Sequence, residues 1–520
     1  MTPPPDTTHH PGRKQRGRNP REVELKFQLP KGSRAVLEAY PPLAGAVAHH
    51  HHLVSTYFDT PNRALDRCGL TLRVRRDGAI RTQTVKSRPD GNGVAVNRGE
   101  WEWPIEQDSP DVTRLEKTEP LAAAALAIEG QLQPAFVTDV LRTTRLLSLA
   151  GDTTVEVAFD EGRIDAGAAH EAISELELEL KGGSVGPLYQ LAASLQSLAP
   201  LWLLSDSKAA RGWHLRTGES EGAQLRQAPK LKRKISGAAG FQQLLGGALG
   251  HLTANIGPTM RGDPEGLHQA RIAIRETRAL LRLFDPFLDK TSTLQFTMKL
   301  RHFAQVLGDA RDWDVFCLET LPAAKPELPS DRLVSLNAAA ETERHLAHEA
   351  VVSALQGREF SQLILALMVW SNSEAFDSSR GHGGAMHHRL SILAPSLLHR
   401  AAARVRGRGR HVGRLSVEGR HCLRKALKKL SFNVDDLAHF FGAKGAKRYR
   451  RRCEALEKIL GLANDAVVTD RLTLKLVAAG RPELSKSAHI LKRWSHLRRQ
   501  RSLKGLSDAM KDFRDVSVFW

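Results

Sequence analysis

Two short segments alternate charged and apolar residues without a break. Residues 22–27 are EVELKF and residues 175–181 are ELELELK. Successive side chains of a strand point to opposite faces, so each segment would present a charged row backed by an apolar row. In the second segment three glutamates would stand about 7 Å apart with no base between them, which is unfavourable unless cations lie among them. Because Mg²⁺ and Mn²⁺ prefer carboxylate oxygens, the pattern indicates a divalent metal site.

Basic residues follow the same alternation in other segments. Arg73 and Arg75 alternate with Leu72 and Val74, and Lys86 sits in a similar setting. Guanidinium groups suit phosphate oxygens because they donate paired hydrogen bonds. A sheet with one solvated face would explain any single row. A sheet closed into a barrel would explain all of them, since it turns the rows inward into a charged tunnel and leaves the apolar rows outside under helices.

The spacing of apolar and polar residues changes about midway along the chain. Its 520 residues exceed the roughly 250 to 300 at which single cores stop growing. Up to about residue 213, short alternating segments are separated by Gly, Pro and Asp, which predicts strands and turns; later segments rich in Leu, Ala, Arg and Lys have helical spacing. We therefore expect an α+β chain with a disordered basic arm (1–20), an antiparallel β-barrel with flanking helices (21–215), a linker (216–239) and an all-α domain (240–520).

The helical half contains an internal repeat. HQARIAIR begins at His268 and HCLRKALK at His421, while LGDARDWDV begins at Leu307 and LGLANDAVV at Leu460. Both pairs are offset by 153 positions, which indicates a duplicated helical unit. On the first motif helix the bases recur within an arc of roughly 80° and form a stripe, which the second copy largely keeps. A solvated face would explain one stripe, but its duplication favours a surface for a polyanion.

The N-terminal segments resemble the CYTH domain of the triphosphate tunnel metalloenzymes over roughly residues 21–213. EVELK is similar to the family's opening ExExK, and YFDTP, LRVR, VKS, RGEWE, VAFDEG, ELELELK and SKAARG occur in the family's order. The resemblance implies a barrel that hydrolyses inorganic triphosphate to diphosphate and phosphate with Mg²⁺ or Mn²⁺. Thiamine triphosphatase and class IV adenylyl cyclase-like activities remain alternatives within the family.

The same resemblance assigns roles to individual charged residues. It implies catalytic roles for Glu22, Glu24 and Lys26, and a metal site made of Glu22, Glu24, Glu102, Asp160, Glu175, Glu177 and Glu179. It implies that the triphosphate is held by Lys26, Arg73, Arg75, Lys86, Arg98 and Lys208, with Arg142 and Arg145 as alternatives for a further ligand. A dissociative transition state spreads charge over phosphate oxygens, so fixed cations would act by positioning and electrostatic stabilisation.

The repeated helical motifs resemble the CHAD domain, the conserved-histidine α-helical domain. The resemblance implies two four-helix bundles, about 240–390 and 391–520, related by a pseudo-twofold axis, with a basic surface that binds inorganic polyphosphate. The second copy departs from the pattern, with Asn464 and Asp465 where the first has Arg311 and Asp312. The implied polyphosphate contacts are His268, Arg271, Arg275, Arg278, His421, Arg424, Lys428 and Lys429.

Composition limits the partners. The 76 Lys and Arg against 57 Asp and Glu give a formal net charge of +19, which favours polyanions. Aromatic residues are only 6% of the chain, so we expect no specific nucleic acid, since single strands usually need stacking surfaces. The cysteines form no CxxC pair and no apolar run reaches the roughly 20 residues of a membrane helix. We expect a cytoplasmic protein that can associate with polyphosphate granules; a weakly catalytic or non-catalytic granule-docking protein is the alternative, and the oligomeric state stays open.

Overall fold

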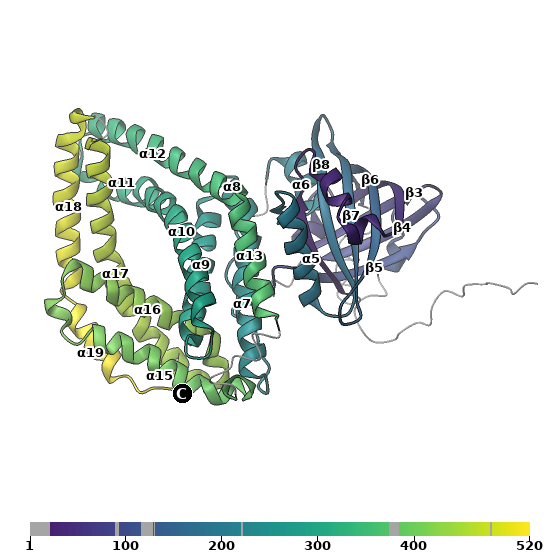
Figure 1. Ribbon diagram of the computed structural model, residues 1–520. Helices are drawn as coiled ribbons and strands as arrows, with labels where there is room; N and C mark the ends of the chain where they lie inside the picture. Colours follow the sequence, from purple (N-terminus) through teal and green to yellow (C-terminus); the bar gives the residue numbers. More distant parts are fainter. Residues whose placement is uncertain are drawn as a thin grey trace, which may run out of the picture.

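The N-terminal half forms a closed antiparallel barrel in the computed structural model, which describes residues 21–88, 93–115, 128, 131–219, 222–373, 384–478 and 481–520. Eight strands follow the spatial order β5-β4-β3-β2-β6-β7-β8-β1, and pairing of β1 with β5 closes the ring (Figure 1). The strands are β1 (Arg21–Gln28), β2 (Ala48–Asp59), β3 (Leu70–Asp77), β4 (Ile80–Ser87), β5 (Val96–Pro104), β6 (Gln133–Leu149), β7 (Thr153–Ala166) and β8 (Ala169–Gly182). The predicted antiparallel barrel is confirmed.

Strand register brings the charged rows side by side. Across β1 and β5, Glu22 stands opposite Arg98. Across β1 and β8, Glu24 stands opposite Glu179 and Lys26 opposite Glu177. Directly opposed residues of an antiparallel pair share a face of the sheet, so these acids and bases meet on the inside of the barrel.

The apolar rows lie on the outside of the barrel, as predicted. Leu25, Phe27, Leu176 and Leu178 alternate with the charged residues and are almost completely buried. They pack in one hydrophobic cluster with apolar residues of α5 (Val185–Leu198) and with Leu37 of α1 (Ser33–Glu38). Burial of apolar surface on the outside, at about 25 cal/mol per Å², therefore fixes which face of each strand turns inward.

The C-terminal half is helical, and its helices repeat with the spacing found in the sequence. Corresponding helices begin 153 residues apart: α7 (Gly237–Ala254) with α15 (Leu390–Arg408), α9 (Pro264–Phe284) with α16 (Val417–Leu437), and α10 (Lys290–Val315) with α17 (Ala443–Ala478). The remaining longer helices are α12 (Ser330–Gln356), α13 (Arg358–Ser371), α18 (Ser485–Leu503) and α19 (Leu506–Asp515). None of the helices within the described ranges combines the length and hydropathy needed to cross a membrane.

Matching N-caps start the two motif helices. The Asp263 side chain accepts a hydrogen bond from the Glu265 amide at the start of α9, and the Ser416 side chain accepts one from the Gly419 amide at the start of α16. Such caps satisfy backbone donors that have no partner within the helix. The repeat therefore extends to the residues that set the helix ends.

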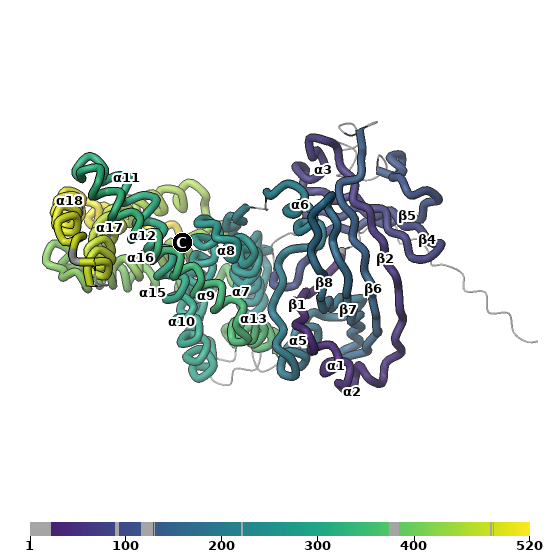
Figure 2. The backbone as a smooth tube through the Cα atoms, turned by 90° about the horizontal axis from the view of Figure 1, so that it is seen from above, coloured from purple at the N-terminus to yellow at the C-terminus, as the bar shows by residue number. Residues whose placement is uncertain are grey.

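The two halves share one continuous hydrophobic cluster. It runs from the outer face of the barrel through α5 to Phe360 and Leu363 of α13 and to the apolar sides of α7 and α9. Figure 2, viewed from above, shows the helical half lying against the α5 side of the barrel. Residues 222–236, which join the halves, pack on the helical side, where Leu231 is buried and Arg226 forms ion pairs with Glu276 and Asp436.

Candidate functional site

A cavity of about 210 Å³ lies inside the barrel and is lined mainly by charged side chains. Most of the residues predicted from the charged rows line it: Glu22, Glu24, Lys26, Arg73, Arg75, Lys86, Arg98, Glu102, Arg142, Glu177, Glu179 and Lys208. Because these residues come from strands far apart in the sequence, barrel closure is what assembles them.

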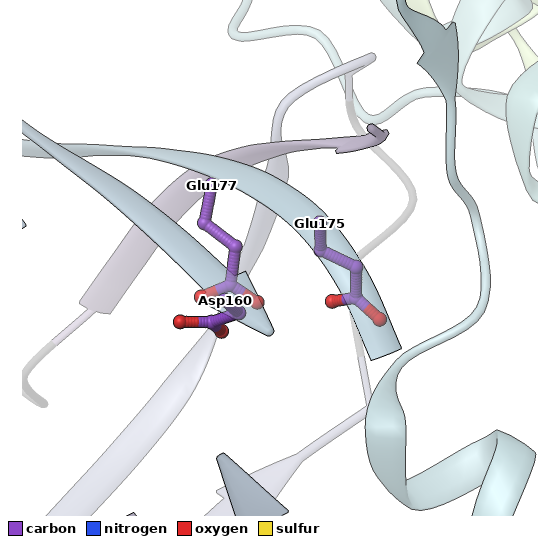
Figure 3. Close-up of side chains that lie close together, drawn as sticks. All are labelled: Asp160, Glu175 and Glu177. Atoms are coloured by element: carbon purple, nitrogen blue, oxygen red, sulfur yellow. The ribbon is translucent and has the colours of Figure 1, made fainter. Parts of the chain in front are cut away.

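A buried acidic cluster adjoins this cavity and reaches it through Glu177. Asp160, Glu175 and Glu177 each offer an oxygen within 4.8 Å of the others, and Figure 3 shows the two glutamates side by side on β8 with Asp160 below Glu177. Lys208 donates to all three, with Nζ–O distances of 2.8, 2.6 and 2.9 Å, respectively. Arg142 pairs with Asp160 and Glu177, both at 2.6 Å. The cluster is thus already neutralised by bases of the protein.

The acids of β1 are also paired. Glu22 accepts hydrogen bonds from Lys86 at 2.7 Å and Arg98 at 2.8 Å, while Glu24 contacts Arg98 at 2.8 Å and Lys26 at 3.2 Å. Burial alone would raise the pKa of Glu22, but Lys86, Arg98 and Lys26 together hold that pKa far below its ordinary value. Glu22 is therefore a permanent anion at neutral pH.

Glu179 differs from these acids because its surroundings are mainly acidic. Its one ion-pair partner among the described residues is Lys181, at 2.8 Å. Burial raises the pKa of Glu179 in spite of Lys181, and the neighbouring carboxylates Glu22 and Glu156 raise it further. Carboxylates that gather with a deficit of positive charge are the donor set that Mg²⁺ and Mn²⁺ select. These residues fit a divalent cation.

On the basic side of the cavity, Arg73 and Arg75 have no close anionic partner among the described residues. The nearest carboxylate oxygen to Arg73 is that of Glu100, at 3.9 Å. Within the described part of the chain, the Nε atoms of Arg73 and Arg75 are buried without a hydrogen-bond partner. Burial, together with the positive charges of Arg73 and Arg142, lowers the pKa of Arg75. An anion placed between these groups would relieve both the repulsion and the unmet donors.

The two residues of β6 that were predicted as alternative phosphate ligands, Arg142 and Arg145, lie on different faces of the barrel wall. Arg142 lines the cavity, whereas Arg145, three residues further along the strand, lies outside it and contacts Glu38 of α1 at 3.1 Å. An odd spacing along a strand reverses the face, so the two side chains point to opposite sides of the barrel wall. This geometry favours Arg142 as the further ligand.

Four residues at or beside the cavity were given no role by the sequence motifs. Glu100 contacts Lys86 at 2.9 Å, and Glu156 also lines the cavity; both belong to charged rows of their strands, Glu100 with Arg98 and Glu156 with Asp160, but neither was predicted as a ligand. Tyr57 lines the cavity, and although burial would raise its pKa, Arg73 and Arg75 lower it. Arg211 of α6 (Lys208–Thr217) ion-pairs with buried Glu175. No alternation of charge marks the last two residues.

A second, larger cavity lies between the two copies of the helical repeat. Its volume is about 430 Å³. Predicted residues from both repeats line it, namely His268, Arg271, Arg275, His421 and Arg424, and further bases are Arg311, Arg420, Arg471 and Arg499. Burial, with Arg271 and Arg424, lowers the pKa of Arg275. Burial also lowers the pKa of both histidines, with help from Arg311 at His268 and Lys425 at His421.

The remaining predicted bases lie elsewhere. Lys429 lines a small cavity of about 70 Å³ with Arg282, Arg404 and Arg408. Burial and the charges of Arg278 and Arg282 lower the pKa of Lys429 to about 8. Lys428 contacts Glu457 at 2.5 Å and lines neither cavity. Arg278 also lines neither cavity, and its buried Nε has no hydrogen-bond partner among the described residues. The stripe seen in the sequence is thus divided by the fold into two basic cavities, one paired lysine and Arg278.

Family models match both halves of the chain. Residues 20–213 match the CYTH domain and residues 243–474 match the CHAD domain. The chain therefore consists of a CYTH domain followed by a CHAD domain, as the sequence motifs predict.

Individual relatives agree with this assignment. An inorganic triphosphatase of Haemophilus influenzae is 33% identical over 200 residues, which span 37% of this chain and 54% of that protein. The chain thus matches about half the length of that relative. An uncharacterized protein of Mycobacterium tuberculosis is 25% identical over 492 residues, spanning 88% of this chain and 89% of that protein. The crystal structure of the CHAD domain from the plant Ricinus communis aligns with a TM-score of 0.51 and 21% identity, covering 58% of this chain and 99% of that chain, which shows the helical fold alone.

Proposed function

We propose that the barrel hydrolyses inorganic triphosphate to diphosphate and phosphate with Mg²⁺ or Mn²⁺. The observation that carries this proposal is the division of one cavity between two arginines and an acidic group. The buried Nε atoms of Arg73 and Arg75 have no hydrogen-bond partner among the described residues, and the charge of the acidic group around Glu179 is not balanced by bases. A site that lacks an anion on one side and a cation on the other matches a metal–phosphate substrate. The inorganic triphosphatase relative supports the same activity.

The residues divide the work by position. Arg73, Arg75 and Arg142, with Lys26, Lys86, Arg98 and Lys208, would bind phosphate oxygens and stabilise the charge that spreads over them in the transition state. Glu22, Glu24 and Glu179, with Glu102 beside them, would hold the divalent cation. The cation supplies charge neutralisation and favours ionisation of the attacking water. Asp160, Glu175 and Glu177 were also predicted as metal ligands; since Lys208 and Arg142 occupy them, we assign them the holding of those two bases. Glu22 and Glu24 are paired with bases too, but they adjoin the unbalanced Glu179, because Glu24 stands opposite it across the strands and the charge of Glu22 raises its pKa.

The lining also favours an inorganic substrate. Tyr57 is the one aromatic residue among the described residues that line the cavity, and charged side chains make up most of the rest. A nucleobase or a thiazole ring would need an apolar or stacking surface, which this lining does not offer. We therefore place inorganic triphosphate ahead of ATP and thiamine triphosphate as the substrate.

For the helical half we propose polyphosphate binding in the 430 Å³ cavity. The supporting observation is that both repeats contribute bases to one cavity, where Arg271 reaches a carboxylate, Asp312, only at 3.6 Å. A polymer of phosphate would supply the missing negative charge. The same contacts would hold the protein on cytoplasmic polyphosphate granules.

Phosphate release from tripolyphosphate, ATP and thiamine triphosphate tests the proposal for the barrel. We expect rapid release from tripolyphosphate with Mg²⁺ or Mn²⁺, and a loss of about 100-fold or more in the variant Arg75→Met, which removes a transition-state contact without breaking an ion pair. Arg163→Met is the matched control, because Arg163 is an exposed barrel arginine paired with Asp165. No release from any substrate, together with tight polyphosphate binding, would identify a docking protein instead.

A further inference from the structure

One short segment connects the helical half to the barrel site. Residues 202–203 form β9, which pairs with β1 through Leu203 and Phe27, and the Leu204 amide donates to the Lys26 carbonyl at 2.9 Å. Five residues after Leu203 the segment reaches Lys208, whose ammonium group contacts the whole buried acidic cluster. The segment therefore touches one site residue through its backbone and carries another.

The helical half contacts this segment through two hydrogen bonds and one ion pair, at three successive points along the segment. The Leu203 amide donates to Ser361 Oγ of α13 at 3.0 Å. Ser205 Oγ accepts from the Gly257 amide of α8 (Ile256–Met260) at 3.2 Å. Asp206 then forms an ion pair with Arg261, the residue that follows α8. Along the sequence, each of these contacts lies closer to Lys208 than the one before.

The contact between α8 and Asp206 is close. A Cβ atom on Gly257 would lie 2.3 Å from Asp206 Oδ1 and 2.8 Å from Asp206 Cγ, well inside van der Waals contact. Ser205 and Ser207 also line a small cavity of about 70 Å³ together with Glu24, Lys26 and Arg98. The gripped segment is thus part of the wall of the site as well as the support of Lys208.

Other contacts between the halves are of a different kind. Arg358 of α13 donates to the carbonyls of Gln196 and Ser197 at the end of α5, at 3.1 and 2.7 Å. Those carbonyls belong to the outer helix of the barrel and lie outside the residues that line its cavity. Arg358 therefore provides a contact that joins the domains without reaching the site.

We propose that Gly257 and Arg261 of the helical half are positioning residues for Lys208, so that the CHAD domain completes the triphosphate site of the CYTH domain. This inference rests on the proposed function. An ammonium group that must sit among three carboxylates and face a phosphate chain depends on the exact place of its backbone, and α8 fixes that backbone from outside the barrel. Displacements of about 1 Å can cost up to 100-fold in rate even when they begin far from the reacting atoms.

A double-mutant cycle on the full-length protein tests this role. We expect Arg261→Ala to lower kcat/KM for tripolyphosphate about tenfold, Arg261→Lys to restore most of it, and Arg358→Ala to leave it within about twofold. In a Lys208→Met background Arg261→Ala should have no further effect, because it acts through Lys208. Lys208→Arg replaces Lys208→Met as the background if thermal unfolding shows that the latter does not fold.

Tripolyphosphate affinity measured by calorimetry in EDTA separates this inference from the proposed function. A wild-type protein that releases no phosphate would overturn the proposed activity, yet the same cycle in affinity would still test whether Arg261 acts through Lys208. The positioning role would be overturned if Arg261→Ala lowered the measured affinity or kcat/KM equally in both backgrounds. It would also be overturned if Arg358→Ala caused a loss as large as that from Arg261→Ala. Gly257→Ala should reproduce the Arg261→Ala loss, since its methyl group would push Asp206 away.

Discussion

The barrel cavity and the helical cavity are both rich in arginine and lysine, but their bases have different partners. In the barrel Lys26, Arg98 and Lys208 each contact carboxylates within 3.2 Å, and although burial would lower the pKa of each group, those carboxylates raise it. In the helical cavity burial lowers the pKa of Arg271 and Arg275. A mixed lining holds its charges in fixed places, which suits chemistry; an unbalanced basic lining suits the capture of a polyanion.

The largest effect should follow from removing the acidic side of the barrel. Glu22→Gln with Glu24→Gln removes two carboxylates that pair with Lys86, Arg98 and Lys26, so both the cation site and the placement of the bases are lost. We expect phosphate release from tripolyphosphate to fall by about 1,000-fold or more. Polyphosphate binding, measured on the same preparation, should stay unchanged. Loss of both activities together would show that the two regions are not separable.

A smaller effect should distinguish the two faces of β6. Arg142→Met removes a base that contacts Asp160 and Glu177 at the cavity, whereas Arg145→Met removes an outer contact to Glu38. We expect kcat/KM for tripolyphosphate to fall about 100-fold in the first variant and to stay within about threefold of wild type in the second, which loses at most a partly exposed ion pair. Similar losses in both variants would contradict the assignment of Arg142. Steady-state kinetics checks the prediction, with thermal unfolding as the control for folding.

In the helical cavity the expected effect is on affinity. Arg275→Met with Arg424→Met removes one base from each repeat, and charged hydrogen bonds of about 1.5 to 3 kcal/mol each predict a loss of at least tenfold in polyphosphate affinity. Calorimetry at two salt concentrations should also show a weaker salt dependence than in wild type. Lys428→Met should change little, because Lys428 is paired with Glu457 away from the cavity. Triphosphatase activity should be retained in both the double variant and Lys428→Met.

Sequence patterns predicted those parts of the molecule that repeat with a simple period. Alternation in EVELKF and ELELELK predicted a charged lumen, and the offset between His268 and His421 predicted helices that begin 153 residues apart. Both patterns show which side chains are excluded from an apolar core, and this exclusion can be recognised from the spacing of polar and apolar residues along the sequence. The barrel and the duplicated helical half followed from them.

Contacts set by three-dimensional packing were not predictable in the same way. Tyr57 and Arg211 stand in the family motifs YFDTP and SKAARG, but no alternation of charge marks either as a neighbour of the charged rows. Their places depend on the pairing of β2 within the barrel and on how α6 packs against it. Lys428 and Lys429 are adjacent in the sequence, yet one is neutralised by Glu457 and the other is crowded by arginines. The partner of each base is decided by helices that meet only in the folded protein.

The smallest effect concerns the pH dependence of stability that a single lysine of the helical half, Lys429, should contribute. Burial and neighbouring arginines lower the pKa of Lys429 to about 8 from its ordinary value of 10.5. Between these values the unfolded chain keeps a proton that the folded protein has released, so the free energy of unfolding should rise with pH from about 8 to about 10.5. Below pH 8 both states carry the charge, and its repulsion destabilises the fold.

Lys429→Met should remove this contribution, as urea unfolding at pH 7.5 and 9.5 would measure. Lys208→Met should not flatten this rise, because the pKa of Lys208 is raised rather than lowered. If the free energy of unfolding changes with pH in the same way in the wild type and in the Lys429→Met variant, the prediction is wrong. Lys429 would then stay charged through contact with an anion or solvent.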